Sequence, residues 1–357
     1  MIMMGNDSVL IDTLLRQLST AFKIRDLGVP HFFLGIEMVP SGAGLILSQR
    51  RYMKDILTRS GMTDCKALAT PAAVTQPATP SLTPFENPTQ YRRIVGALQY
   101  LTITRPDLSY SVNRLCQFMH SPTNDHWALL KRVLRYIKGT QDYGLRLSVS
   151  SSSDLHAFTD SDWAGCPVDR KSTSGYAVFL GDNLVSWVSR KQRTVARSST
   201  EAEYKGLADV AAEVTWVVSL LRELGLHSGS PTTLWCDNLG ATYLAANPVF
   251  HARTKHVEID YHFVRDKVAS GEFIVSFVST KDQLADIFTK PLPAPRYQAL
   301  RDKLNFRDAC YEYGLLDDEN EYIDGITNSS YWASVYALQR LFATLLTSSS
   351  ISRPEVV

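Results

Sequence analysis

The feature that most limits the fold is the order of strand-like and helix-like segments in the second half of the chain. Three strand-like segments rich in β-branched or aromatic residues are followed by a long helix, a strand, two helices, a strand and a last helix. In order they are LHAFTDSDWAG, GYAVFLGDN, LVSWVSRKQ, STEAEYKGLADVAAEVTWVVSLLRELGL, TTLWCDN, NLGATYLAAN, TKHVEIDYHFVRDKVASG, EFIVSFVS and KDQLADIFTK. This order, βββαβααβα, predicts an α/β fold with a mixed five-stranded sheet flanked by helices.

Four acidic residues are distributed over this pattern, each in its own local context. They are Asp160 in FTDSDWAG, Glu203 in STEAEYKGL, Asp237 in LWCDNLGA and Asp286 in QLADIFTK. Most of them lie at the end of a strand-like run or in the first turn of a helix, where side chains can point into a shared cleft. Carboxylates that converge repel one another unless cations lie between them. Because hard divalent ions take oxygen ligands, the pattern predicts a metal site suited to phosphoryl transfer.

Composition and charge narrow the class of protein. The formal charge of +1 is unevenly distributed, because residues 1–147 hold 17 Lys and Arg against 10 Asp and Glu. Residues 148–305 hold 17 against 18, and residues 306–357 hold 3 against 8. A basic first part suits a polyanion such as a nucleic acid backbone. Scattered cysteines, the lack of a long apolar run and the lack of a secretory start predict an intracellular protein, neither secreted nor membrane-bound.

The first part of the chain predicts fewer elements. We expect a helix over residues 8–23, then a β-hairpin of FFLGIEMV and LILSQ around PSGAG, then a second helix. The Pro-rich stretch 71–89 predicts an extended linker. A helix capped by Asn124 and ended by Gly139 is expected over 124–138, and residues 148–154 predict a short flexible joint. Further helices are expected over 90–103 and 107–120, separated at Arg105-Pro106.

Seven phrases in the second half occur in a family-specific order: TDSDWAG, KSTSGY, SRKQ, ARSSTEAEY, WCDNLGA, HARTKHVEIDYHFVRD and ADIFTKPL. With them, the chain closely resembles the RNase H domain of copia-type LTR retrotransposon Pol polyproteins. The phrases DLGVPHFFLGIEM, LSQRRYMKDIL and YRRIVGALQYLTITRPDLSY resemble the end of the reverse transcriptase that precedes this domain. The resemblance implies a ribonuclease H-like sheet preceded by a truncated reverse transcriptase palm, thumb and connection.

The resemblance also implies a division into domains. The expected parts are a palm-end and thumb remnant (1–70), the linker (71–89), a helical thumb or connection segment (90–147), an RNase H-like domain (154–304) and an acidic tail outside the family pattern (305–357).

In the family, four acids bind two Mg²⁺ ions, for which Mn²⁺ can substitute, and the RNA strand of an RNA–DNA hybrid is cleaved. The matching positions are the catalytic and metal-binding candidates Asp160, Glu203, Asp237 and Asp286. Three alternatives stay open. Asp162 competes with Asp160, Glu201 competes with Glu203 at the positive end of a helix, and Asp282 competes with Asp286 or caps the last helix.

Basic residues crowd the turn between the third strand and the long helix. We expect Arg190, Lys191, Arg193 and Arg197 to contact phosphates, with a solvated charge run as the alternative, and Asn238 to contact substrate beside Asp237. His256 and His262 are expected to pack or lie on the surface. Many cellular relatives carry a His-containing loop before the last Asp, and SFVSTKDQLAD has no His, so any proton relay would come from water or from elsewhere.

Polymerase activity is not expected. Reverse transcriptases hold their metals with the paired Asp residues of a YxDD-type motif, which the family places just before the stretch equivalent to Met4–Asp7. The chain begins there, so the resemblance predicts an incomplete polymerase, for which other Pol fragments of the element are candidate partners.

Three functions remain in competition. An RNA–DNA hybrid endonuclease in a cytoplasmic particle or the nucleus fits the complete acidic set. A decayed or domesticated fragment that binds nucleic acid without cleaving it fits the incomplete polymerase. A transposase- or resolvase-type nuclease fits less well, because the acids follow the order Asp-Glu-Asp-Asp behind a polymerase-like segment.

Overall fold

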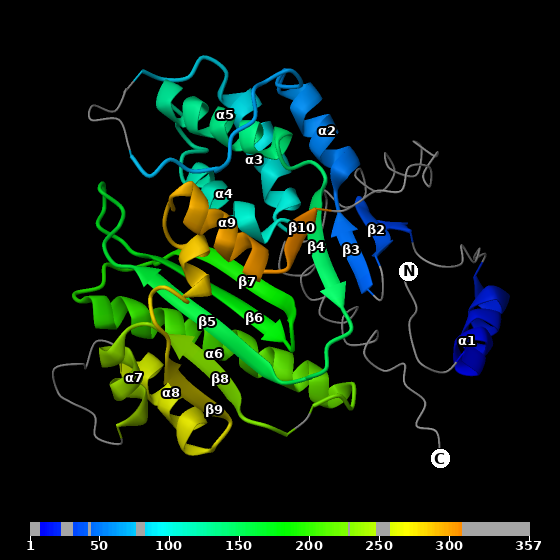
Figure 1. Ribbon diagram of the computed structural model, residues 1–357, viewed down its shortest axis with the longest axis vertical. Coiled ribbons are helices and arrows are strands. Elements are labelled where there is room, and N and C mark those ends of the chain that lie inside the picture. The colour runs from blue at the N-terminus through cyan, green and yellow to red at the C-terminus, as the bar shows by residue number, and fades with distance from the viewer. Residues whose placement is uncertain are drawn as a thin grey trace.

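Two five-stranded sheets with helices packed on them make up the described part of the chain (Figure 1). In the computed structural model, the described residues are 8–22, 31–41, 44–75, 83–227, 229–247 and 258–308. None of the helices in these ranges is both long and apolar enough to span a membrane.

The sheet formed by the second half of the chain, called the second sheet below, has the strand order β7-β6-β5-β8-β9. Its strands are β5 (Leu155–Asp162), β6 (Thr173–Leu180), β7 (Asn183–Lys191), β8 (Thr232–Cys236) and β9 (Phe273–Phe277). The first three pair antiparallel, whereas β8 runs parallel to both β5 and β9. Parallel neighbours need a crossover, which the helices between them supply. The expected ribonuclease H-like α/β topology is therefore confirmed.

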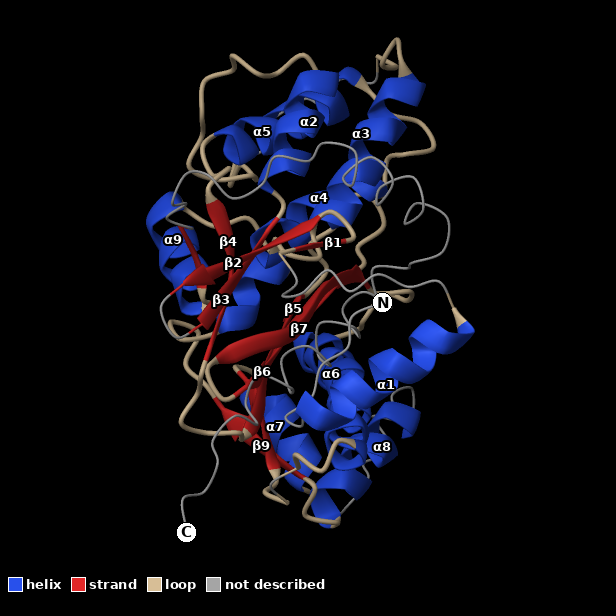
Figure 2. Cartoon of the chain, turned by 90° about the vertical axis from the view of Figure 1, so that its right-hand side faces the viewer, coloured by secondary structure: helices blue, strands red, loops and turns tan. Residues whose placement is uncertain are grey.

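Helices cover both faces of this sheet. The helix α6 (Ser199–Glu223) begins where the Ser198 hydroxyl accepts the amide of Glu201 at 3.1 Å, and it lies on one face with α7 (Leu239–Ala246) and α8 (Glu258–Ala269). The opposite face carries a 3₁₀ turn, η3 (Leu284–Phe288), and α9 (Ala294–Lys303) (Figure 2). The helix expected over KDQLADIFTK is thus only this short turn, because prolines follow it, and α9 was not expected.

The other sheet, called the first sheet below, is antiparallel throughout and has the strand order β1-β2-β3-β4-β10. Its strands are β1 (Phe32–Phe33), β2 (Ile36–Ser41), β3 (Gly44–Ser48), β4 (Tyr143–Ser148) and β10 (Phe306–Asp308). The expected hairpin is present, although Leu34 and Gly35, both at positive φ, interrupt its first strand. Neither β4 nor β10 was expected. The strand β10 lies within the segment that was predicted to be a tail outside the family pattern (305–357). The start of that segment therefore forms part of this sheet.

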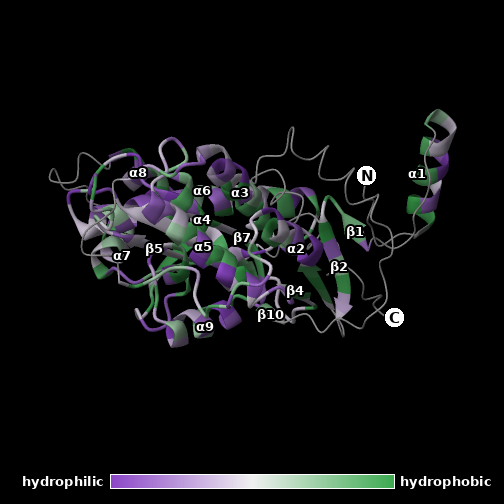
Figure 3. Cartoon of the chain, turned by 90° about the horizontal axis from the view of Figure 1, so that it is seen from above, coloured by the Kyte–Doolittle hydropathy of each residue, from purple (hydrophilic) through white to green (hydrophobic). Residues whose placement is uncertain are grey.

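The remaining helices are α1 (Ser8–Ala21), α2 (Arg50–Arg59), α3 (Pro88–Leu101), α4 (Ser109–Cys116) and α5 (Asn124–Lys138). The predicted cap of α5 was wrong by one position, because Thr123 caps the helix and its amide donates to the His126 ring at 3.0 Å. α4 is shorter than the helix expected over 107–120. Of the Pro-rich linker, residues 76–82 lie outside the described residues. α1 stands apart from the other described elements (Figure 3).

The expected flexible joint at residues 148–154 is hydrogen-bonded to a turn of the second sheet. The Ser148 amide donates to the Asn183 side chain at 2.9 Å, and the Ser150 hydroxyl accepts the amide of Asp182 at 3.2 Å. The prediction of flexibility rested on serine composition, which does not report hydrogen bonds to a distant turn.

A buried ion pair joins the two halves of the molecule. The Arg105 side chain has no exposed surface and donates to both carboxylate oxygens of Asp107, at 3.0 and 2.9 Å. Tyr136 donates to the same carboxylate at 2.7 Å, and Tyr297 of α9 donates to the Asp107 carbonyl at 2.8 Å. The Trp187 indole of β7 donates to the Thr102 carbonyl at 3.2 Å. The second sheet and its C-terminal helix thus share a polar core with the α3–α5 region.

Removing the charge of Arg105 should destabilise the whole chain. Arg105→Met leaves the Asp107 carboxylate buried without its counter-ion, and we expect the free energy of unfolding to fall by about 3–5 kcal/mol. Urea unfolding measures this. The control is Arg59→Met, whose exposed pair with Asp55 should contribute less than about 1 kcal/mol. Equal losses in the two variants would contradict the role assigned to the buried pair.

Candidate metal centre

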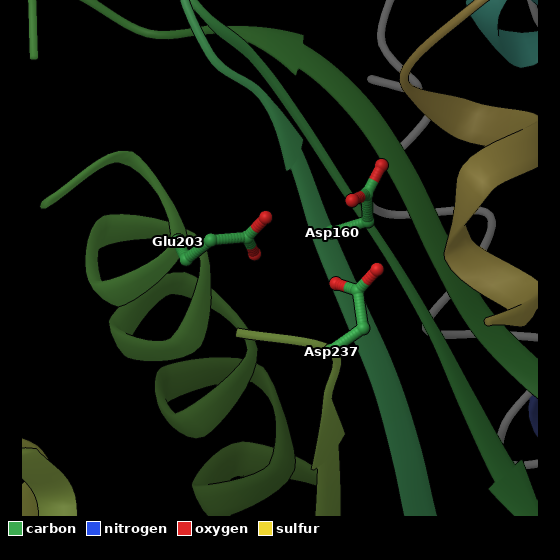
Figure 4. Close-up of side chains that lie close together, drawn as sticks. All are labelled: Asp160, Glu203 and Asp237. Atoms are coloured by element: carbon green, nitrogen blue, oxygen red, sulfur yellow. The ribbon is translucent and has the colours of Figure 1, made fainter. Parts of the chain in front are cut away.

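Three carboxylates from three separate elements point toward one another at one edge of the second sheet (Figure 4). Asp160 lies on the central strand β5, Glu203 lies in the first turns of α6, and Asp237 directly follows β8. One oxygen from each carboxylate lies within 4.8 Å of the others. Asp160 and Glu203 are buried, and Asp237 is half-buried. The arrangement offers oxygen ligands at a spacing that suits a hard divalent cation.

Two glycines allow neighbouring elements to pack closely around this group. A Cβ on Gly206 of α6 would lie 2.8 Å from the Ser161 hydroxyl, so glycine lets the helix carrying Glu203 approach β5. A Cβ on Gly175 of β6 would overlap Phe288 of η3. Gly175 is the register partner of Asp160, so its missing side chain lets η3 pack beside the site.

Burial and mutual repulsion disfavour the charged forms of these acids. Burial, followed by the charges of Asp160 and Asp237, raises the pKa of Glu203 to about 9. Burial also raises the pKa of Asp160 to about 6, although the Lys290 ammonium opposes this. The Asp237 carboxylate accepts a hydrogen bond from the Thr280 hydroxyl at 3.1 Å. A bound cation would relieve the repulsion that the protein by itself leaves in place.

The fourth candidate, Asp286, is buried in η3 but lies outside the three-carboxylate group. Its carboxylate is paired with two cations: the Lys290 ammonium at 2.7 Å and the guanidinium of Arg296. Lys290 also lies 3.2 Å from Asp160, which accepts a further hydrogen bond from the Thr289 hydroxyl. Burial alone would lower the pKa of Lys290, but Asp160 and Asp286 raise it above its ordinary value.

The alternative acids Glu201, Asp162 and Asp282 all lie outside the three-carboxylate group. Glu201 accepts the Arg197 amide at 2.7 Å and pairs with Lys205 at 2.7 Å, so it is engaged away from the three-carboxylate group. Asp162 lies two residues beyond Asp160, and its carboxylate packs against the turn at Gly165, where a Cβ would overlap it. Asp282 pairs weakly with Lys303 at 3.5 Å on the surface, and Gln283, not Asp282, caps η3.

The basic residues predicted to contact substrate differ in exposure. Arg190, Arg193 and Arg197 are exposed, whereas Lys191 is half-buried and pairs with Asp169 at 3.0 Å. Asn238 caps α7 by accepting the Ala241 amide at 3.0 Å. Of the two histidines, His262 is exposed on α8, and His256 lies outside the described residues.

Sequence reasoning missed the cations that hold Asp286. Lys290 follows Asp286 by four residues, which is a spacing that brings side chains together on a helical turn, so this pair was open to prediction. Arg296 lies beyond three prolines, and no local pattern places it near Asp286.

Comparison with known proteins finds relatives of the chain. A family model described as "Reverse transcriptase (RNA-dependent DNA polymerase)" matches residues 1–74. The retrovirus-related Pol polyprotein from transposon RE2 of Arabidopsis thaliana is 52% identical over 301 residues, which are 84% of this chain and 21% of that polyprotein. The counterpart from transposon TNT 1-94 of Nicotiana tabacum is 33% identical over 85% of this chain and 23% of its own length. The uncharacterized mitochondrial protein AtMg00810 of Arabidopsis thaliana is 50% identical, covering 59% of this chain and 88% of that protein.

Solved structures are more distant. The foamy viral protease-reverse transcriptase dRH in complex with ds DNA is 11% identical with a TM-score of 0.43, covering 76% of this chain and 43% of that one. The N-terminal RNase H domain of rv2228c from Mycobacterium tuberculosis is 14% identical with a TM-score of 0.28, covering 42% of this chain and 98% of that one.

The strand order and flanking helices define a ribonuclease H-like domain that follows a reverse transcriptase segment. The chain belongs to the family of retrovirus-related Pol polyproteins of copia-type transposons. It spans about a fifth of the length of the RE2 polyprotein.

The crowded carboxylates should make the stability of the metal-free chain depend on pH. The folded-state pKa of Glu203, about 9, lies above its ordinary value of 4.5. The contribution of Glu203 to the free energy of unfolding is therefore complete below pH 4.5 and is lost as the pH rises toward 9. In EDTA, we expect Glu203→Gln to be more stable than the wild type at pH 8, with a smaller difference at pH 5. Urea unfolding at both pH values measures this.

The control is Glu201→Gln, which removes a buried acid that is already paired with Lys205. This substitution should not reproduce the pH-dependent gain. A difference between wild type and Glu203→Gln that is the same at both pH values would contradict the prediction.

Proposed function

We propose that the RNase H-like domain cleaves the RNA strand of RNA–DNA hybrids with two Mg²⁺ ions, for which Mn²⁺ can substitute. The observation that supports this most is the convergence of Asp160, Glu203 and Asp237, brought from three elements to within 4.8 Å. Buried carboxylates this close are unfavourable without a cation, and their oxygens are the ligands that Mg²⁺ prefers. Membership of the transposon Pol family supports a nucleic acid as the substrate.

Each residue of the site has a distinct part in this proposal. Bound divalent ions would supply the positive charge that phosphoryl transfer requires. Asp160, Glu203, Asp237 and Asp286 would hold the ions, the first three as the converging group. The Thr280 hydroxyl orients Asp237, and the Thr289 hydroxyl orients Asp160. These contacts fix the carboxylates before substrate arrives.

Substrate contacts are proposed for the exposed cations beside α6. Arg190, Arg193 and Arg197 are exposed, and the charges of Arg190 and Arg193 act on Asp209 of α6. Lys191 would first have to leave Asp169, and Asn238 would contact substrate through the part of its side chain not used in capping. Other Pol fragments of the element remain proposed partners. Primer extension by these 357 residues is not expected, because the printed sequence contains no Tyr-x-Asp-Asp motif.

Binding without cleavage is the second candidate. The observation that favours it is the pairing of Asp286 with Lys290 and Arg296, which neutralises part of the site without any divalent ion. A cleavage assay separates the two candidates.

Loss of one ligand charge should abolish cleavage and leave binding intact. We expect Asp160→Asn and Asp237→Asn in the full chain to lower the Mg²⁺-dependent cleavage rate by at least about 100-fold, because metal-ion catalysis supplies several kcal/mol. Gel assays on a labelled hybrid measure cleavage, and fluorescence anisotropy measures binding. The control is Asp282→Asn, which removes an exposed acid near η3. Near-wild-type rates in both site variants would refute the assignment. A wild-type chain that binds but does not cleave would establish the second candidate.

The exposed arginines should contribute to the salt dependence of binding. Each phosphate neutralised adds about 0.9 to the slope of log affinity against log salt on a duplex. Replacing Arg190, Arg193 and Arg197 together with Gln should therefore reduce that slope by about 2.7 units. The control is Arg222→Gln, an exposed arginine at the far end of α6. An unchanged slope in the triple variant would mean that these side chains do not contact the backbone.

A further inference from the structure

The Lys290 side chain lies between Asp286 and Asp160, which belongs to the three-carboxylate group. The Lys290 ammonium lies 2.7 Å from an oxygen of Asp286 and 3.2 Å from an oxygen of Asp160. The lysine side chain is 32% exposed, whereas both carboxylates are almost completely buried. Lys290 is therefore the contact through which Asp286 is joined to Asp160.

Lys290 pairs with only two of the four acids. Among the described residues, the ion pairs of Asp160 and Asp286 are made by Lys290 and Arg296, and no ion pair reaches Glu203 or Asp237. The three-carboxylate group of Asp160, Glu203 and Asp237 therefore has one lysine at its border and no cation at its centre. The Asp286 side already has its charge balanced.

A divalent ion ligated by both Asp160 and Asp286 would need the position that the ammonium holds. Two cations a few ångströms apart repel strongly in a partly buried site. Lysine has a flexible four-carbon stem, so its head group can leave a carboxylate pair without a change of backbone. Arg296 would remain, because it pairs with Asp286 and also donates to the Thr280 carbonyl.

We propose that Lys290 is a built-in counter-cation that competes with the second divalent ion, so that the site fills in two unequal steps. The first ion binds among Asp160, Glu203 and Asp237. The second binds between Asp160 and Asp286 only when the Lys290 ammonium is displaced. This inference rests on the proposed metal-dependent function, and it assigns to Lys290 control over how many ions the site holds before substrate arrives.

Counting bound Mn²⁺ in the full chain without nucleic acid tests the proposal. Free Mn²⁺ is followed by electron paramagnetic resonance during a titration of wild type and Lys290→Met, which keeps the length of the side chain and removes its charge. We expect one tight and one weak site in the wild type. In Lys290→Met, the second site should bind at least about tenfold more tightly, because a unit charge next to that ion is gone.

The matched control is Lys281→Met, which removes the same charge from an exposed lysine without a described ion pair in the segment before η3. It should titrate like the wild type. If Lys290→Met and wild type bind two ions with equal affinities, the inference is overturned and the proposed function stands. If neither binds Mn²⁺, both fail.

A second measurement needs no substitution and applies even if Lys290→Met does not fold. Brief acetylation of the wild-type chain, followed by peptide mass spectrometry, reports the accessibility of each lysine amine. The Lys290 amine should react faster once the Mn²⁺ concentration is high enough to fill the second site, with Lys281 as the internal reference. A Lys290 reactivity that does not change while two ions bind would overturn the proposal.

Discussion

The buried pair of Arg105 and Asp107 is the interaction on which the arrangement of the chain depends. It lies where the α3–α5 helices meet the C-terminal helix of the second sheet, and Tyr297 is attached to it through the Asp107 carbonyl. The Arg105 guanidinium also lies 4.8 Å from the centre of the Phe306 ring, in the strand that closes the first sheet. A charge this deeply buried is tolerated only when every partner is present. Tyr297 and Phe306 thus bring the C-terminal part of the described chain into contact with this buried pair.

This dependence extends to the acidic site. The turn η3 carries Asp286 and Lys290, and it continues into α9, whose Tyr297 reaches the Arg105–Asp107 network. Arg296 of the same helix pairs with Asp286. The position of the fourth acid is thus coupled to a polar core made by residues almost two hundred positions earlier. A fragment that starts near residue 150 would lose that support, which is why full-length variants give the clearer test.

Several elements and part of the site could be predicted from local pattern. The strand–helix order implied the topology, and the capping serine before α6 located Glu203 at the start of that helix. Asp160 and Asp237 were found because each lies in or directly after an apolar strand. By contrast, β4 and β10 are short and find their partners far away in the sequence, so no local signal marks them. The serine-rich joint is hydrogen-bonded to Asp182 and Asn183, which no local pattern indicates, and its flexibility stays a prediction.

The sequence by itself determined the fold class, the family and the identity of the acids, because each depends on residue type and order. Only the tertiary structure decided how the acids are grouped. Asp160, Glu203 and Asp237 converge because β8 lies beside β5 and because Gly206 lets α6 pack closely against β5. Asp286 lies outside this group and is paired with Lys290 and Arg296. Local patterns describe one element at a time, whereas repulsion, burial and ion pairing depend on which elements the folded chain brings together.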